Sequence, residues 1–148
     1  MDAKLDELTR LLKKHIGHYE KLAELLSLEQ AALMDLDLER LQKVTKAKET
    51  MALKIKLLVP ALAQAITEAA GLLGVPAEPL PTLAELSQAA LEPYRTRFEK
   101  AGVALARLKR GVLRHNEDNQ VFVREALDMV SGSVAILTGA AASAPRKG

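Results

Sequence analysis

Residues 5–33 read LDELTRLLKKHIGHYEKLAELLSLEQAAL, and this stretch decides the fold. Mostly apolar residues recur in it in alternating steps of three and four, which is the a/d pattern of helices that pack along a coiled-coil-like seam. The seam positions are Leu5, Leu8, Leu12, His15, Tyr19, Leu22, Leu26, Glu29 and Leu33. Leu11, Ile16, Leu25 and Leu28 widen the seam into a bundle-type face. The pattern predicts a helix over residues 2–34.

A second helix is predicted over residues 37–73, after the Asp35-Leu36-Asp37 turn. Asp37 suits the N-cap because its carboxylate can accept hydrogen bonds from the first free amides of a helix. A short turn between two such helices requires an antiparallel hairpin. Pro60 is expected to bend the second helix; whether it also splits the helix is left open. Lys48 falls in the seam, with Glu24 or Glu29 as candidate partners across the hairpin.

The only clear loop is residues 74–81, which contain three prolines. Thr82 and Glu85 then form a capping-box pattern that begins a short helix over residues 82–90. A long helix follows over residues 92–138, and Pro93 suits its first turn or a kink. Its seam is Tyr94, Phe98, Ala101, Leu105, Leu108, Val112, His115, Asn119, Phe122, Ala126, Met129, Ser133 and Ile136.

The expected fold class is therefore all-α. We predict an elongated antiparallel helical bundle with coiled-coil-like packing, built from three long helices and one short helix. Residues 1–139 are expected to form this single domain, and residues 140–148 a flexible tail. The roles of Gly102 and Gly111 in the last helix are left open.

Composition excludes several classes of protein. The chain has 148 residues, no cysteine and a net charge of only +2. Without cysteine there is no disulfide, thiolate metal site or cysteine nucleophile, which fits a cytoplasmic protein. Charges of mixed sign argue against a nucleic-acid binder. The longest uncharged stretch, residues 129–145, is too short and too rich in small residues for membrane insertion.

No catalytic, cofactor-binding or metal-binding arrangement is expected. A bundle metal site of the di-iron type needs Glu-x-x-His spacing on facing helices, and the sequence has none. We interpret His15, His18 and His115 as one seam histidine and two exposed ones. Carboxylates at adjacent helix positions point about 100° apart and do not converge on a substrate. The chain is predicted not to be an enzyme.

A basic cluster lies in the first half of the last helix. Its members are Arg95, Arg97, Lys100, Arg107, Lys109, Arg110 and Arg114, and Glu117, Asp118, Glu125 and Asp128 follow them. One interpretation is a solvated face with helical salt bridges. The other is a docking surface for a partner of opposite charge pattern. Nucleic acid is disfavoured because no aromatic residues are interleaved for base stacking.

The end of the last helix carries more apolar surface than one seam needs. Beside the seam runs a second stripe with the same steps of four and three. We define the C-terminal arc as Phe122, Val123, Leu127, Val130, Val134 and Leu137. An exposed apolar surface of this width is typical of a partner site. The alternative is that the first hairpin covers the whole arc.

Several short motifs follow one another along the chain. They include Tyr19-Glu20-Lys21-Leu22, Glu29-Gln30-Ala31-Ala32-Leu33, the Asp35-Leu36-Asp37 turn, the Lys46 to Leu53 stretch, Leu73-Gly74 with the proline loop, and Thr82-Leu83-Ala84-Glu85-Leu86. The most telling is Asn116-Glu117-Asp118-Asn119 inside an apolar helix. In their order and spacing these motifs resemble the FlgN-like flagellar type III export chaperones. Asn116 and Asn119 are interpreted as polar seam residues that fix helix register.

The resemblance implies a cytoplasmic chaperone that binds C-terminal amphipathic helices of flagellar hook–filament junction proteins. It would prevent their premature assembly and aid their delivery to the export apparatus, whose components are a second class of partner. The family's client contact lies toward the C-terminus, which carries over to Phe122, Val123, Leu127, Val130, Val134 and Leu137. The alternative is a self-associating coiled-coil adaptor with no export role. The oligomeric state and the individual client are left open.

Overall fold

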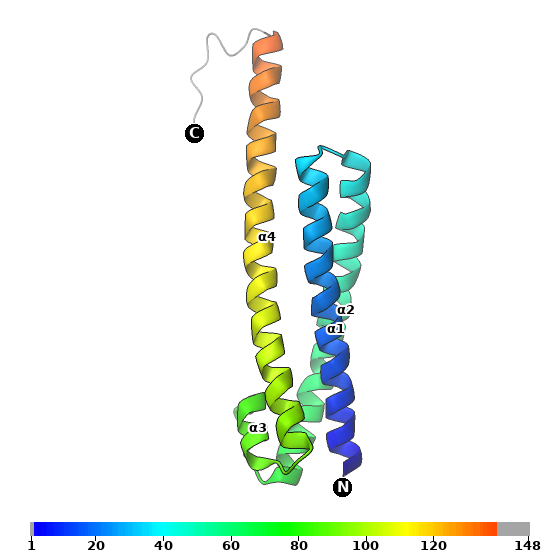
Figure 1. The fold of residues 1–148 in the computed structure, drawn as a ribbon, viewed down its shortest axis with the longest axis vertical. Coiled ribbons are helices and arrows are strands. Elements are labelled where there is room, and N and C mark those ends of the chain that lie inside the picture. The colour runs from blue at the N-terminus through cyan, green and yellow to red at the C-terminus, as the bar shows by residue number, and fades with distance from the viewer. Residues whose placement is uncertain (1, 139–148) are drawn as a thin grey trace.

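The computed structural model describes residues 2–138, with the backbone alone for Asp2, Val130 and residues 133–138. It contains four helices: α1 (Asp2–Met34), α2 (Leu38–Leu73), α3 (Leu83–Ala89) and α4 (Tyr94–Thr138). The all-α class, with three long helices and one short one, is confirmed (Figure 1). Helix α1 has the predicted range, and the other three helices differ from theirs by one or two residues at their ends. The predicted tail, residues 140–148, lies outside the described residues.

Local signals in the sequence place the helix ends. The Asp37 side chain accepts a hydrogen bond from the Arg40 amide at 3.1 Å and caps α2. At the other end of α2, Gly74 adopts a left-handed conformation with φ of 70°, which a residue without Cβ reaches at little cost. The Thr82 hydroxyl accepts from the Glu85 amide at 3.1 Å and caps α3. Pro60 does not split α2, which is continuous around it.

Pro93 precedes the last helix and lies outside it. The predicted start at residue 92 is therefore wrong by two residues, since α4 begins at Tyr94. Its start is bound back to α3: the Arg95 guanidinium donates to the backbone oxygens of Ala90 and Gln88, at 3.0 and 3.2 Å. These bonds satisfy carbonyl groups that the end of a short helix leaves without amide donors.

Helix α1 is the central element of the bundle. It packs antiparallel against α2, as the short turn requires, and it runs parallel to α4 on another side (Figure 1). Helix α3 packs on the first part of α4 and touches α2. Throughout the described residues, no Cα atom of α2 comes within 8 Å of a Cα atom of α4. The two outer helices therefore stay apart and α1 fills the space between them on one side only.

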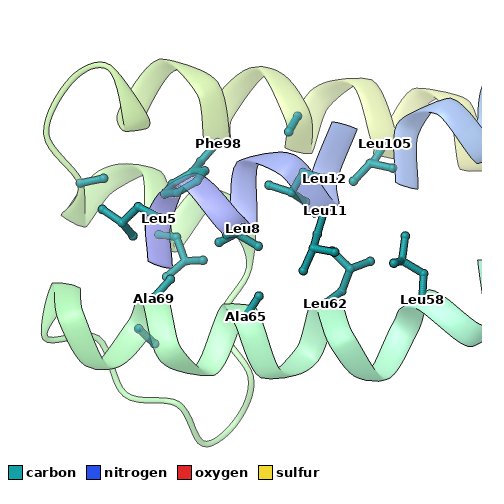
Figure 2. Close-up of a cluster of buried hydrophobic side chains, with 14 residues drawn as sticks. Leu5, Leu8, Leu11, Leu12, Leu58, Leu62, Ala65, Ala69, Phe98 and Leu105 are labelled. Atoms are coloured by element: carbon teal, nitrogen blue, oxygen red, sulfur yellow. The ribbon is translucent and has the colours of Figure 1, made fainter. Parts of the chain in front are cut away.

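The hydrophobic core lies at the end of the bundle where all four helices meet. Figure 2 shows leucines of α1 between alanines and leucines of α2 and the Phe98 and Leu105 side chains of α4. Leu8, Leu86 and Phe98 are fully buried. Gly102 brings α3 close, because a Cβ there would lie 3.3 Å from the Leu83 Cβ. Gly111 has open space around its Cα and plays no such role.

Helix α2 is long and apolar enough to cross a membrane, judged by length and composition alone. In this fold its buried face, including Leu58, Leu62 and Ala65, packs in the shared core. Core helices of soluble bundles have the same composition, so the feature does not by itself indicate a membrane span.

The histidine interpretation is correct for one residue and wrong for two. His15 is buried as a seam residue, and its ring meets the Tyr19 ring edge-on at 5.0 Å between centroids. His18 and His115 are half-buried, not exposed. The Nε2 atom of His115 lies 3.0 Å from the Gln30 side-chain oxygen. His18 and His115 are partly covered because α1 packs against α2 on one side and against α4 on another.

Burial of His15 makes the stability of the fold sensitive to acid. Its Nδ1 atom has no hydrogen-bond partner among the described residues. Loss of hydration, helped by the nearby charges of Lys109 and His18, lowers the pKa of His15 from 6.5 to about 4. The unfolded chain therefore takes up this proton below pH 6.5, whereas the folded chain does so only near pH 4. The contribution of His15 to the free energy of unfolding is therefore fully present above pH 6.5 and is lost as the pH falls toward 4.

We expect a His15→Leu variant to be at least as stable as the wild type at neutral pH. Between about pH 7 and about pH 4.5 its free energy of unfolding should fall less than that of the wild type, by on the order of 1–2 kcal/mol, since solvent screening reduces the full linkage effect. Urea unfolding followed by circular dichroism at both pH values measures this. Parallel losses in the two proteins would show that His15 does not carry the effect.

Candidate functional site

Helix α4 extends beyond the rest of the bundle. The Tyr94 hydroxyl donates to Asp6 at 2.6 Å, and the Asn119 amide donates to Glu29 at 2.9 Å. Contacting residues of α4 and α1 therefore differ in number by about 90, so Met34, the last residue of α1, lies level with about residue 124. The remaining residues of α4, about 14 in number and ~20 Å long, project past the α1–α2 turn (Figure 1).

A buried polar network holds α4 against the hairpin just before this projection. Asn119 is 1% exposed, and its amide donates to the Leu26 backbone oxygen and to the Glu29 carboxylate, both at 2.9 Å. The Lys48 ammonium donates to the same carboxylate at 2.9 and 3.0 Å and to the Asn116 oxygen at 3.4 Å. Glu29, and not Glu24, is thus the partner of Lys48. The network joins α1, α2 and α4 at one height.

This network fixes the register of the three helices. An apolar seam tolerates sliding by one heptad, whereas a buried amide and a buried carboxylate need their partners at one position. The predicted role of Asn119 as a polar seam residue agrees with this geometry, and Asn116 contributes through Lys48. The height at which α4 leaves the hairpin is therefore set by specific hydrogen bonds.

The C-terminal arc begins where coverage by the hairpin ends. Phe122 is half-buried, Val123 is 38% exposed and Leu127 is 61% exposed. Val130, Val134 and Leu137 fall on α4, and their side chains lie outside the described residues. The hairpin therefore does not cover the described part of the arc beyond Phe122. Met129, predicted as a seam residue, is 70% exposed for the same reason.

A groove lies between α2 and α4, with α1 as its floor. It has a volume of about 640 Å³. Tyr19, Leu22 and Leu26 form the floor, and the walls are Thr45, Lys48, Glu49 and Ala52 of α2 with Lys109, Val112, Leu113 and Asn116 of α4. The lining is mainly apolar, and Leu113 is 62% exposed at its edge. We call this the α2–α4 groove.

Sequence reasoning did not identify the α2–α4 groove. Leu113 lies outside the seam predicted for the last helix, and Leu113 and Ala52 were each one apolar residue among many. A signal exists in α4, where Lys109, Leu113, Asn116, Gln120, Val123 and Leu127 recur in steps of four and three beside the seam. That stripe extends the second stripe of the C-terminal arc toward the N-terminus. The surface of α4 that lines the groove and the surface of the arc are thus the same face of one helix.

Three members of the basic cluster contact other residues of the chain. The Arg95 guanidinium donates to backbone oxygens at the end of α3. Arg97 lies 3.9 Å from Asp6 and over the Tyr94 ring, and the Lys109 ammonium lies 5.7 Å from the Tyr19 ring centroid. All three residues remain exposed. Among the described residues there is also no group of three metal-ligating side chains.

Comparison with known proteins gives one match. No curated protein and no solved structure matches the chain. The family model described as FlgN protein matches residues 1–146, nearly the whole sequence. The chain belongs to the FlgN protein family of flagellar export chaperones.

Proposed function

We propose that this protein is a cytoplasmic chaperone for flagellar hook–filament junction proteins. The C-terminal arc would bind an amphipathic helix at the C-terminus of the client. One observation carries the proposal: within the described residues α4 passes the α1–α2 turn (Figure 1), and there Leu127 and Met129 are 61% and 70% exposed. An apolar face on a helix pairs readily with the apolar face of another helix.

The expected binding free energy suits a chaperone that binds its client reversibly. Burying a leucine or valine side chain fully contributes on the order of 1.5–3 kcal/mol. Only part of this free energy appears as affinity, because association and the ordering of side chains cost entropy. A few arc residues are therefore enough for a complex that forms in the cytoplasm and releases at the export apparatus. While bound, the client helix cannot make its own assembly contacts, so premature assembly and aggregation are prevented.

A self-associating adaptor is the alternative, and the same exposed residues favour it. In that case two copies would bury their arcs against each other, and no junction protein would bind. A stable dimer at micromolar concentration without affinity for junction proteins would support the adaptor. Sedimentation of the chain alone and with client separates the two functions.

Truncation of α4 tests the chaperone proposal. Removing residues 125–148 deletes the projection and keeps Phe98, Asn119 and the hydrogen bonds that join α4 to α1. Purified hook–filament junction proteins of the source bacterium should bind the full chain in isothermal titration and bind the truncated chain at least ~100-fold more weakly, a difference of about 2.7 kcal/mol. Thermal unfolding of both chains checks that the bundle persists. Equal binding by the two chains would rule out the C-terminal arc.

A further inference from the structure

The α2–α4 groove is a feature that the proposed function does not yet use. Two long helices stand apart over a third, which is the arrangement of a four-helix bundle from which one helix is missing. We propose that the client helix bound by the C-terminal arc continues into the α2–α4 groove and becomes the fourth helix of the bundle there. This inference rests on the proposed function and extends its binding surface to Leu22, Ala52 and Leu113.

One face of α4 runs through both the α2–α4 groove and the C-terminal arc. Lys109, Leu113 and Asn116 line the groove, and Val123 and Leu127 follow them in the same heptad positions. From Lys109 to Thr138 this face covers about 30 residues, or ~45 Å of helix. A helix that lies against the arc and runs along α4 toward its N-terminus enters the groove without bending. The projection alone would offer a contact of only about four turns.

A second copy of this chain does not fit the groove. In an antiparallel pair with Leu113 of one copy beside Leu127 of the other, the two-fold axis is level with residue 120. Each α1 reaches the level of about residue 124, so the two α1–α2 turns would overlap. Moving the axis to the level of residue 128 separates the turns, but Thr138 of the second copy then reaches only residue 118, above the groove. The occupant is therefore a single helix without a neighbouring hairpin.

The charges along the groove specify the kind of helix that fits. The Lys48 ammonium of the α2 wall is already paired with the Glu29 carboxylate at 2.9 Å. The α4 wall carries the Lys109 ammonium, and the α2 wall carries the exposed Glu49 carboxylate. A client helix with an apolar stripe, an acidic residue on the side toward α4 and a basic residue on the side toward α2 matches this pattern. Charge pairs at the edges of the groove select the orientation more than they add affinity.

Two substitutions test the groove without touching the core. Leu113→Asp places a charge on the apolar wall, and Ala52→Trp fills the groove with a bulky ring; both wild-type residues are exposed. Val103→Asp is the matched control, since Val103 is 65% exposed on the same helix outside the groove. The probes are the purified junction protein and synthetic peptides of about 15 and about 30 residues from its C-terminal helix.

We expect Leu113→Asp and Ala52→Trp each to weaken binding of the long peptide at least 10-fold and Val103→Asp to leave it unchanged. The short peptide should bind all three variants equally. Because the sequence has no cysteine, Leu113→Cys carrying a thiol-reactive crosslinker should also capture the long peptide and not the short one. The melting temperatures of the variants show whether the bundle is intact.

Failure of this inference is distinguishable from failure of the proposed function. If truncation after residue 124 abolishes binding while Leu113→Asp and Ala52→Trp bind normally, the client helix does not enter the groove, and the C-terminal arc remains the proposed binding site. If the groove variants lose binding and the truncated chain does not, the client binds in the groove, and the proposed role of the C-terminal arc is wrong. A variant that changes only the sedimentation of the free chain would assign the groove to self-association and overturn the inference.

Discussion

Replacing Phe98 by alanine is expected to lower the free energy of unfolding by ~3–5 kcal/mol, the usual cost of removing a buried phenylalanine side chain. Phe98 is fully buried at the end of the bundle where all four helices meet, and its ring lies 6.1 Å from that of Tyr94. The side chain fills the space among α1, α3 and α4, and leucines fixed by other contacts cannot collapse into the cavity. For a domain with total stability of ~5–15 kcal/mol, the loss is large.

Phe122→Ala is the matched control on the same helix. Phe122 is half-buried at the point where α4 leaves the hairpin, so its truncation should cost no more than ~1–2 kcal/mol. Guanidinium unfolding of both variants, monitored by circular dichroism at 222 nm, gives the comparison. Equal costs would mean that the projecting end of α4 is packed as firmly as its first half, contrary to this structure.

The sequence predicts the helices well because their signals are local. Seam residues of α1 such as Leu8, Leu12 and Leu26 are buried as the heptad pattern indicates. Asp37 and Thr82 cap α2 and α3 through bonds within four residues of themselves. Lys48 in a seam also predicted a carboxylate partner across the hairpin, because an ammonium among leucines needs one; of the two candidates, Glu24 and Glu29, it is Glu29 that binds.

The candidate site was predicted only in part because it depends on relations between helices. The apolar excess around Leu127 was visible in the sequence, but its exposure depends on where α1 ends relative to α4. That height is set by the bonds of Asn119 to Leu26 and Glu29, residues about 90 positions away. The α2–α4 groove depends on the angle around α1 at which α2 and α4 pack. Neither quantity is encoded in the periodicity of a single helix, and the 42% exposure of Leu28 within a predicted apolar face has the same origin.

The structure thus divides α4 into two parts with different tasks. Up to Asn119, its seam residues are buried or half-buried and belong to the stability of the bundle. Beyond Phe122, the side chains of Val123, Leu127 and Met129 are exposed and contribute little to folding. Substitutions in the second part should therefore change binding and leave stability unchanged, a separation that core positions such as Phe98 do not allow.

The double variant Leu127→Asp with Val134→Asp is expected to abolish client binding while the bundle stays folded. Both residues belong to the second stripe of the C-terminal arc, and Leu127 is 61% exposed in the free chain. Each aspartate removes an apolar contact with the client helix and would have to lose its hydration in the complex, which costs free energy unless a partner compensates. Together these effects predict a loss of affinity of at least ~100-fold, or about 2.7 kcal/mol.

Val121→Asp is the control for this double variant. Val121 is 49% exposed on the same stretch of α4, but two residues along a helix place it about 200° from Val123, away from the arc. It adds the same type of charge without touching the proposed surface. Titration with the junction protein should give wild-type affinity for Val121→Asp and no measurable binding for the double variant, with equal helicity in both. If all three proteins bind alike, the client contact lies elsewhere; if both variants lose binding equally, added negative charge near the end of α4 is the cause, and the arc has no special role.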